Sequence, residues 1–298
     1  MTNRKIEIRR ATKADARPAF DVCMLAMADE FKRANLEWKM EPEQFWKGLA
    51  PLYRHLAEHC AEWWVAQAVS DGKLIGYARS VERGDLFELS EFFIEPGQQS
   101  AGLGRELIER AFPVGRGRVR LILATLDERA LARYFRADTV ARFPLAMMSA
   151  APRPSEAIEL EASVATLDDV EQLDAIERAV VGHSRAHEYP WLLEEREGFL
   201  YKRNGTVVGY GFLGSFGQGP VAALEPELQR SILLHLEGRA HARGLEQISF
   251  VVPTINQVAV THLLARGFRI DPPLNLFMSN EPFGHFDRFV SYGPPVIL

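Results

Sequence analysis

Residues 91–112 read EFFIEPGQQSAGLGRELIERAF: an apolar run, a turn that contains Gly97, Gly102 and Gly104, and then a helical repeat. The pattern predicts a strand that passes through a glycine-rich turn into a helix. Small residues at the start of a helix let its backbone approach a ligand, and the free N–H groups there favour an anion. The stretch is therefore either a simple turn or a binding site for phosphate groups.

Two nucleotide-binding motifs are excluded by the residues after the turn. A P-loop has Gly-Lys-Ser/Thr at this point, but Gly104 is followed by Arg105 and Glu106. The dinucleotide fingerprint needs a third small residue where Leu107 stands, and no βαβ pattern surrounds it. A pyrophosphate at the helix start stays compatible with the sequence. Nine arginines against five acidic residues between Arg105 and Arg142 favour such a ligand; a plain turn is the alternative.

The composition is that of a globular protein with about two domains. The chain has 298 residues, of which 47% are hydrophobic and 25% charged. Residues 1–152 hold 23 Lys and Arg against 21 Asp and Glu, and residues 153–298 hold 12 against 19, which gives a net charge of −5. This weakly acidic total argues against nucleic acid as a partner. Without a long apolar segment or a signal-peptide pattern, we expect a cytoplasmic protein that does not contact a membrane.

Three segments of the second half repeat segments of the first half in the same order. The pairs are IEIRRATKADA (6–16) with IELEASVATLDDV (158–170), SDGKLIGYARS (70–80) with RNGTVVGYGFL (203–213), and DERALARYFRADT (127–139) with NQVAVTHLLARGF (256–268). Their shared order predicts a duplicated domain. Each copy is expected to be α/β, with a mixed, largely antiparallel sheet. The linker SAAPRPSEA (149–157) sets the predicted domains at 1–150 and 155–298.

The glycine turn resembles the pyrophosphate loop of the GNAT superfamily of N-acetyltransferases. In that family the loop follows the pattern Q/R-x-x-G-x-G/A at the end of a long strand, and Gln99, Gly102 and Gly104 stand at its defining positions. The order of elements is similar too, strongly in residues 6–148 and weakly in 158–298. The resemblance implies two tandem GNAT-like acyl-CoA N-acyltransferase domains. It also implies acetyl-CoA as a co-substrate of the first domain, without a metal ion.

The resemblance further implies which residues contact acetyl-CoA. In the family the strand before the loop splays from its neighbour, and its backbone pairs with the pantetheine arm; the matching residues are Phe92, Phe93 and Ile94. The implied loop residues are Gln99, Ser100, Ala101, Gly102, Leu103, Gly104 and Arg105. The family's Asn-x-x-Ala-x-x-x-Tyr helix is matched by Asp127, Ala130 and Tyr134, with Asp in place of the usual Asn.

The implied reaction is direct attack of a primary amine on the thioester. Tyr134 is the predicted general acid for the departing thiolate. Glu91 and Glu88 are the candidate bases, and their spacing of three residues predicts opposite faces of the strand. We favour Glu91 slightly. The alternative is a non-catalytic acyl-CoA-binding or sensor protein in which Tyr134 merely packs.

The second half departs from the GNAT pattern at the pyrophosphate loop and at the tyrosine position. It has Glu225 and Glu227 in place of the glycine pair, and Leu263 in place of Tyr134. We therefore predict a degenerate, non-catalytic second domain that does not bind CoA and that supports folding, oligomerisation or the acceptor site. The apolar residues 282–298 are expected to form strands that complete its sheet. The predicted partners are a small-molecule or peptide amine acceptor and possibly a second copy of the chain.

Overall fold

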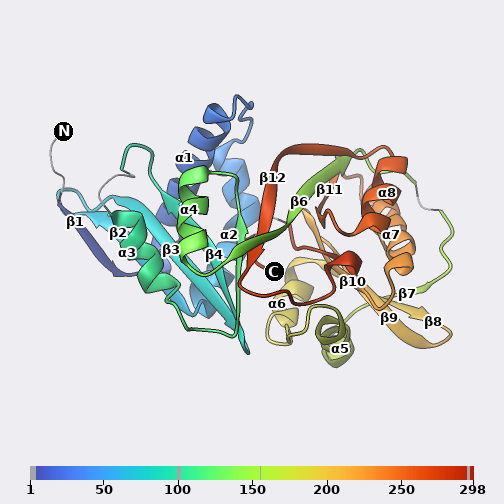
Figure 1. The fold of residues 1–298 in the computed structure, drawn as a ribbon. Coiled ribbons are helices and arrows are strands. Elements are labelled where there is room, and N and C mark those ends of the chain that lie inside the picture. The colour runs from blue at the N-terminus through green and yellow to red at the C-terminus, as the bar shows by residue number, and fades with distance from the viewer. Residues whose placement is uncertain (1–4, 99–101, 155, 294–295) are drawn as a thin grey trace. The chain divides into compact units, whose positions relative to one another are not determined.

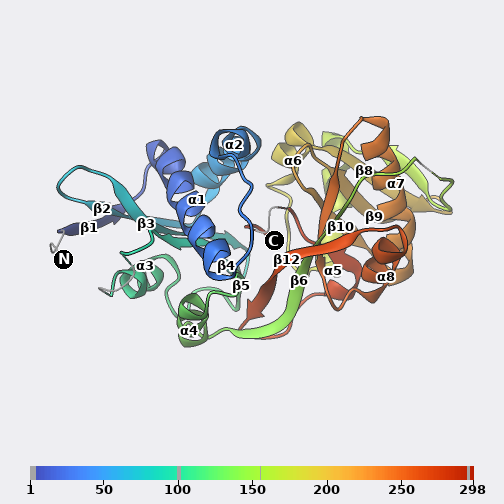
Figure 2. The same cartoon turned by 90° about the horizontal axis from the view of Figure 1, so that it is seen from above.

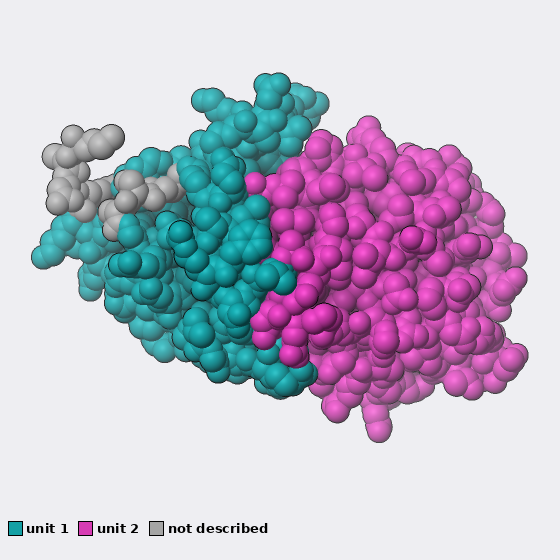
Figure 3. Space-filling model, in the orientation of Figure 1, with its two compact units in different colours: residues 1–122, 127–140 teal, residues 123–126, 141–298 magenta. Residues whose placement is uncertain are grey.

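The computed structural model describes residues 5–98, 102–154, 156–293 and 296–298. Its helices and strands are labelled in Figure 1, and Figure 2 shows them from a second direction. The chain divides into two compact units, which Figure 3 colours separately. Unit 1 comprises Met1–Ile122 and Asp127–Val140, and unit 2 comprises Leu123–Leu126 and Ala141–Leu298.

Unit 1 contains an open mixed sheet. Its strands are β1 (Ile6–Arg10), β2 (Glu62–Ala68), β3 (Leu74–Arg83), β4 (Leu86–Ile94) and β5 (Val119–Ala124), and they lie side by side in that order. The first four are antiparallel neighbours, whereas β5 runs parallel to β4. A parallel pair needs a crossover connection, which the glycine turn and the helix after it provide.

Four helices cover this sheet. They are α1 (Ala16–Arg33), preceded by the short η1 (Lys13–Asp15), then α2 (Pro42–His59), α3 (Leu103–Ala111) and α4 (Glu128–Arg136). Figure 2 shows α1 and α2 over one face of the strands, and α3 and α4 over the other. The helix α2 begins at Pro42. Proline suits the first helical position because the N–H that it lacks would have no partner inside the helix there.

A β-bulge interrupts β4 where it passes under the helices. The register with β3 goes from Arg79↔Glu91 to Ser80↔Leu89, so Ser90 is an extra residue on β4. A bulge of this kind bends its strand and increases the local twist. The segment of β4 after Ser90 therefore runs in a different direction from the segment before it.

Unit 2 contains two groups of strands. The first group, in spatial order, is β12 (Arg269–Ser279), β6 (Val140–Ala150) and β11 (Ile248–Pro253). The second is β13 (Phe289–Val290), β10 (Gln218–Ala223), β9 (Thr206–Leu213), β8 (Glu197–Arg203) and β7 (Glu161–Val164). Because β6 pairs with β11, the strand that ends the first sequence repeat belongs to unit 2 from Ala141 onward.

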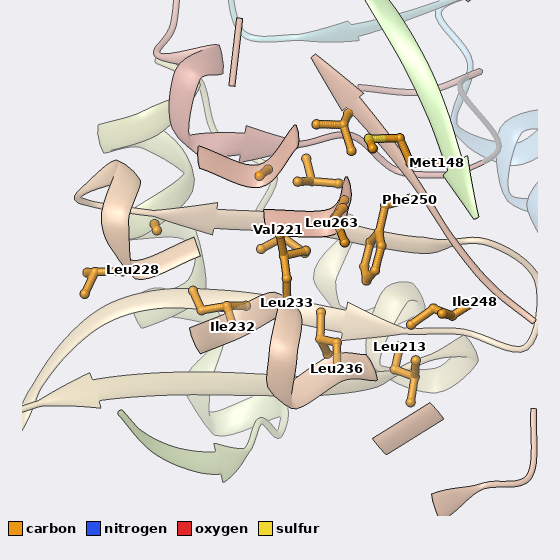
Figure 4. Close-up of a cluster of buried hydrophobic side chains, with 14 of the residues drawn as sticks. Met148, Leu213, Val221, Leu228, Ile232, Leu233, Leu236, Ile248, Phe250 and Leu263 are labelled. Atoms are coloured by element: carbon orange, nitrogen blue, oxygen red, sulfur yellow. The ribbon is translucent and has the colours of Figure 1, made fainter. Parts of the chain in front are cut away.

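One apolar core joins these two groups of strands. The helices of unit 2 are η2 (Leu167–Asp169), α5 (Val170–Val180), α6 (Tyr189–Glu195), η3 (Pro226–Leu228), α7 (Gln229–Ala242), α8 (Gln257–Ala265) and η4 (Phe286–Arg288). Figure 4 shows Met148 and Phe250 from the first group of strands beside Val221 from the second and Leu236 from α7. All four side chains are almost completely buried, so they contribute to one hydrophobic cluster.

The predicted repeat is visible as a matching pair of helix starts. Thr12 and Asp15 form a capping box before α1, and Thr166 and Asp169 form one before α5. In each box the backbone N–H of the threonine donates to the aspartate, at 2.7 Å and 2.9 Å. Two units with the same order of elements and the same local capping chemistry support a duplicated fold.

Candidate active site

The parallel strands β4 and β5 diverge next to the bulge. Their ladder joins residues 86–89 of β4 to residues 119–122 of β5. Beyond this ladder β4 continues to Ile94. The bulge at Ser90 directly follows the last paired residue, and it gives the physical reason for the divergence. The end of β4 thus has a neighbour in β3 but leaves the β5 ladder.

The backbone of this diverging segment points partly into the opening. The N–H of Glu95 donates to the carbonyl of Ile75 on β3. Backbone groups along an antiparallel strand alternate in direction, so those of Phe93 also point toward β3, and those of Phe92 and Ile94 point away from it. Of the three predicted pantetheine-binding residues, Phe92 and Ile94 therefore offer their N–H and C=O groups on the side from which β5 has departed.

The glycine turn brings the start of α3 very close to this segment. Gly102 is in the left-handed region, with φ of 79°, and it is the N-cap of α3. A Cβ atom on Gly104 would lie 3.1 Å from Ile94 Cδ1, from Phe92 Cζ and from Arg133 Nε. Such contacts are too short for a side chain to enter without displacing its neighbours. A side chain at residue 104 would force its neighbours to shift by a few tenths of an ångström. Glycine suits residue 102 because its φ is positive.

The first turn of α3 leaves backbone donors for a ligand. The first bonds inside the helix run from the N–H groups of Arg105 and Glu106 to the carbonyl of Gly102. The N–H groups of Leu103 and Gly104 precede these bonds, as expected at a helix N-terminus. Together with the helix dipole they form a site that favours an anion.

Not all of the predicted loop residues lie at this site. Leu103 is buried and its side chain belongs to the core of unit 1. The side chain of Arg105 is 75% exposed and lies 3.7 Å from Glu109. The predictions for Gln99, Ser100 and Ala101 fall outside the described residues.

Tyr134 lies beside the same segment of β4. Its ring is buried and makes an edge-to-face contact with Phe92, with centroids 6.3 Å apart. Burial raises the pKa of the phenol well above its usual value; the carboxylates of Glu30 and Asp127 act in the same direction, and Arg133 opposes them. The hydroxyl therefore keeps its proton across the physiological pH range and can act as a hydrogen-bond donor.

Asp127 and Ala130 have a structural role at the start of α4. The carboxylate of Asp127 accepts hydrogen bonds from the backbone N–H groups of Arg129 and Ala130, and it pairs with Arg33 at 2.6 Å. Burial alone would raise the pKa of Asp127, but hydrogen bonds from Arg129 and the charge of Arg33 lower it to about 2. This ionised cap fixes the first turn of the helix that carries Tyr134.

The two candidate bases lie on one face of β4. Glu88 is opposite Val81 and Glu91 is opposite Arg79, and these partners are two residues apart on β3. Residues two apart on a regular strand share a face. The prediction that Glu88 and Glu91 point to opposite faces is therefore wrong, because the bulge adds one residue between them.

Glu91 belongs to a buried hydrogen-bonded network under α1 and α2. Arg79 donates to Oε2 of Glu91, with Nε at 2.6 Å, and the hydroxyl of Tyr77 donates to Oε1 at 2.9 Å. The hydroxyl of Tyr53 is 3.3 Å from that of Tyr77. The guanidinium of Arg79 also lies 4.8 Å from the ring centroid of Trp63. Sequence reasoning missed Arg79, although a charged residue inside the apolar run LIGYARS marks an unusual strand.

Both carboxylates are enclosed by protein. The side chains of Glu91 and Glu88 have no exposed surface, and Glu88 lies 3.3 Å from Arg83. A charge buried in this way is stable only with a partner. Proton transfer between an acceptor and either residue therefore needs a bridging group in this conformation.

Unit 2 lacks the glycine turn and the tyrosine. In place of the turn it has η3, and Glu225 before it pairs with Arg203. Leu263 is buried in the core. Asn256 caps α8 by accepting from the N–H of Ala259 at 3.0 Å, so the capping part of the helix pattern is kept.

The C-terminal segment fills the opening that corresponds to the divergence of β4 and β5. In unit 2 these strands correspond to β10 and β11. The antiparallel strand β13 pairs with β10, and Ser291 after it bridges to Val251 of β11. The prediction that this apolar segment contributes a strand to the second sheet is confirmed.

Buried side chains hold this segment in place. Asn256 Nδ2 donates to the carbonyl of Phe289 at 3.0 Å. Arg196 Nη1 donates to the carbonyl of Gly219 on β10, and its Nη2 donates to the carbonyl of Gly293, each at 2.9 Å. One arginine thus connects β10 to the chain that follows β13.

Two further properties of the described residues bear on function. Within the described ranges, no group of three His, Cys, Asp or Glu side chains is arranged to hold a metal ion. None of the helices in that part of the chain is both long and apolar enough to cross a membrane.

One segment of the chain is similar to a known enzyme family. Residues 24–137 match the model of the acetyltransferase (GNAT) family. The matched segment lies in the N-terminal half of the chain and includes the glycine turn and α4, which carry the resemblance. No curated protein matches the sequence.

Solved structures with the same fold include proteins of similar length. A putative acetyltransferase from Pyrococcus horikoshii superposes with a TM-score of 0.75 at 15% identity, over 95% of this chain and 92% of its own. A GCN5-related N-acetyltransferase from Sphaerobacter thermophilus gives 0.61 at 16% identity, over 94% and 97%. A tandem GNAT protein from the clavulanic acid biosynthesis pathway gives 0.58 at 13%, over 93% and 99%. The predicted mixed α/β fold with tandem GNAT-like domains is confirmed.

Proposed function

We propose that the protein is an N-acetyltransferase that transfers the acetyl group of acetyl-CoA to a primary amine of a small-molecule or peptide acceptor. The match of residues 24–137 to the GNAT family model supports acyl transfer from an acyl-CoA to an amine. The observation that carries the proposal is the convergence of three features in unit 1: the freed backbone of β4, the first turn of α3, and Tyr134.

The residues present fit acetyl-CoA as co-substrate. Nothing lies within 4 Å of the point where a Cβ of Gly102 would stand, so this residue leaves open space before α3, and the N–H groups of Leu103 and Gly104 suit the pyrophosphate. The backbone groups of Phe92 and Ile94 suit the pantetheine amides. When bound, acetyl-CoA supplies a thioester whose carbonyl carbon accepts the amine nitrogen.

Backbone N–H groups of β4 and the hydroxyl of Tyr134 have separate roles in the proposed reaction. As the C–N bond forms, an N–H group on the freed edge of β4 stabilises the negative charge on the thioester oxygen. As the C–S bond breaks, the hydroxyl of Tyr134 donates its proton to the departing sulfur. This step is favoured because burial of Tyr134 keeps its phenol protonated.

Glu91 is the proposed base, and it acts through a bridging group. The attacking nitrogen loses a proton, and Glu91 is the carboxylate at the bulge where β4 leaves β5. The hydroxyl of the buried Tyr77 donates to Oε1 of Glu91, so it is the bridging group that we propose between the acceptor side and the carboxylate. Glu88 lies deeper in the paired part of the strand and is the second candidate.

We further propose that unit 2 does not bind CoA. Its β10 edge is paired with β13, the segment after β13 bridges to β11, and the glycine turn is replaced by Glu225 and Glu227. Backbone groups that already have protein partners cannot pair with a pantetheine arm.

The test is release of free thiol from acetyl-CoA with a panel of primary amines, together with calorimetric binding of CoA. Turnover that depends on an amine supports the proposal. Tight binding of CoA without turnover on any amine would favour the alternative of a non-catalytic acyl-CoA-binding or sensor protein. Absence of binding, with no rise in melting temperature at saturating CoA, would overturn both.

A further inference from the structure

The hydroxyls of Tyr53 and Tyr77 form a hydrogen-bonded chain that ends at Glu91. The hydroxyl of Tyr77 donates to Oε1 of Glu91 at 2.9 Å, and the hydroxyl of Tyr53 lies 3.3 Å from that of Tyr77. A phenol carries one proton, and the proton of Tyr77 is already shared with the carboxylate. At the second contact Tyr53 is therefore the donor and Tyr77 the acceptor. The chain has one direction, from α2 through β3 to β4.

The chain is buried, and a partly exposed residue lies at its outer end. Tyr53 and Tyr77 are 3% and 0% exposed. The thiol of Cys23 on α1 lies beside both hydroxyls, and Cys23 is half-buried. Arg79 donates to the other carboxylate oxygen, Oε2 of Glu91. A proton that reaches Oε1 from the side of α1 and α2 therefore passes through the two phenols.

The groups that face this chain hold their protons firmly. Burial raises the pKa of the Cys23 thiol to about 12 and that of the Cys60 thiol above its ordinary value of 9.0. Burial also raises the pKa of both phenols well above 10. It opposes the charge of Arg79, but the carboxylate of Glu91 raises the pKa of this guanidinium above its ordinary value. Because neither phenolate is stable here, a proton crosses only when each phenol gives up one proton and receives another in the same step.

We propose that Tyr53 is the outer member of a proton relay that carries the proton of the attacking amine through Tyr77 to Glu91. This inference rests on the proposed function, because it requires amine attack in unit 1. As the C–N bond forms, the nitrogen releases one proton toward the hydroxyl of Tyr53. Tyr53 passes its own proton to Tyr77, and Tyr77 passes its own to Oε1 of Glu91. Both phenols end neutral, and the carboxylate ends protonated.

The experiment measures amine-dependent thiol release from acetyl-CoA between pH 6 and pH 10. The variants are Tyr53→Phe, Glu91→Gln and the protein that carries both changes. Phe at residue 53 keeps the ring contacts with Phe20 and Trp46, whose centroids lie 5.6 Å and 5.8 Å away, so the fold should be kept. Melting temperatures check this.

Two further variants locate the effect. Tyr77→Phe interrupts the same chain one residue closer to the carboxylate. Tyr189→Phe in unit 2 is the matched control, because it also removes a buried hydroxyl from a helix. That hydroxyl donates to the backbone carbonyl of Leu173 at 3.2 Å, outside the relay. The control should turn over within about twofold of the wild-type protein.

Tyr53→Phe should lower kcat about tenfold at pH 7. The loss should shrink as the pH rises, because the amine then loses its proton to solvent instead. The double variant should be no slower than Glu91→Gln, since a relay without its final acceptor is already interrupted. Tyr77→Phe should show the same pH profile as Tyr53→Phe.

Two results would overturn the inference. One is a Tyr53→Phe profile parallel to that of the wild-type protein, or a double variant whose losses add, because Tyr53 would then act through packing alone. The other is a wild-type profile in Tyr77→Phe, which decides the matter even if Tyr53→Phe does not fold. A wild-type protein that releases no thiol with any amine would instead remove the proposed function.

Discussion

Phe92 of β4 and Tyr134 of α4 meet edge to face, with ring centroids 6.3 Å apart and planes at 74°. This contact ties the diverging strand to the helix that follows β5 in the sequence. It places the phenol beside the backbone that we propose for pantetheine. An aromatic contact of this kind fixes the position of the ring but does not need the hydroxyl.

Replacing Tyr134 by Phe therefore separates packing from proton donation. The ring of Phe keeps the contact with Phe92, so the melting temperature and the KM for acetyl-CoA should change little. The turnover number should fall about 10²-fold, because the departing thiolate loses its acid. Steady-state thiol release measures both quantities.

The matched control is Tyr201→Phe in unit 2, where the hydroxyl is 2.9 Å from His235 Nδ1. That variant should turn over like the wild-type protein. A Tyr134→Phe protein with a turnover number within about threefold of wild type would reduce Tyr134 to a packing residue.

Glu91→Gln should change the pH dependence of the reaction as well as its rate. Without the carboxylate, the amine must lose its proton in solution before it reacts, so activity should recover as the pH rises toward the pKa of the acceptor amine. The variant should also lose about 3–5 kcal/mol of unfolding free energy, because Arg79 keeps its buried charge without a partner. Activity profiles from pH 6 to 10 and denaturant unfolding measure these effects.

Glu88→Gln separates the loss of stability from the loss of a base. Its carboxylate is equally buried and has Arg83 as its partner. We expect a similar loss of stability and an unchanged pH profile. A Glu91→Gln protein that matched wild type across the pH range would exclude Glu91 from the mechanism.

Asp127 should stabilise the fold through its charge as well as through its cap. The pKa of Asp127 is about 2 in the folded protein, against an ordinary value of 3.8. A lowered pKa adds stability above the unfolded value, and this contribution is lost as the pH falls from about 4 to about 2. The Asp127 side chain is 14% exposed, so solvent reduces the gain to about 1–2 kcal/mol at neutral pH.

Asp127→Asn keeps an oxygen for the cap and removes the charge. Its unfolding free energy should be lower than wild type by that amount at pH 7, and the difference should vanish near pH 2. The control is Asp85→Asn, whose partner Arg118 is mostly exposed, and it should cost little at any pH. A pH-independent difference for Asp127→Asn would show that the charge is not responsible.

The sequence was informative wherever the relevant interaction is local. Gly102 could be assigned to a helix start because a glycine before an apolar helical repeat is itself a sequence signal for such a turn. The two Thr-Asp helix starts could be matched because a capping box spans four residues. The order of such local signals was enough to predict two copies of one mixed α/β fold.

The parts that were missed depend on long-range packing. The bulge at Ser90 could not be predicted because LFELSEFFI mixes apolar and polar residues on both faces of a regular strand, so it has no alternation that an inserted residue would break. The approach of Arg133 to Gly104 depends on how α4 lies against α3. The pairing of Phe289 and Val290 with β10 joins segments about 70 residues apart in a way that local pattern cannot specify.

The chain should bind one molecule of CoA, in unit 1. The corresponding opening in unit 2 is filled by β13 and by Ser291, which bridges to Val251. Gly104→Val should weaken binding, because Phe92, Ile94 and Arg133 would have to shift to admit a branched side chain beside the start of α3. Calorimetric stoichiometry measures this directly, and Glu225→Gln in unit 2 should leave it at one. A second site in the wild-type protein would show that β13 does not take the place of a pantetheine arm.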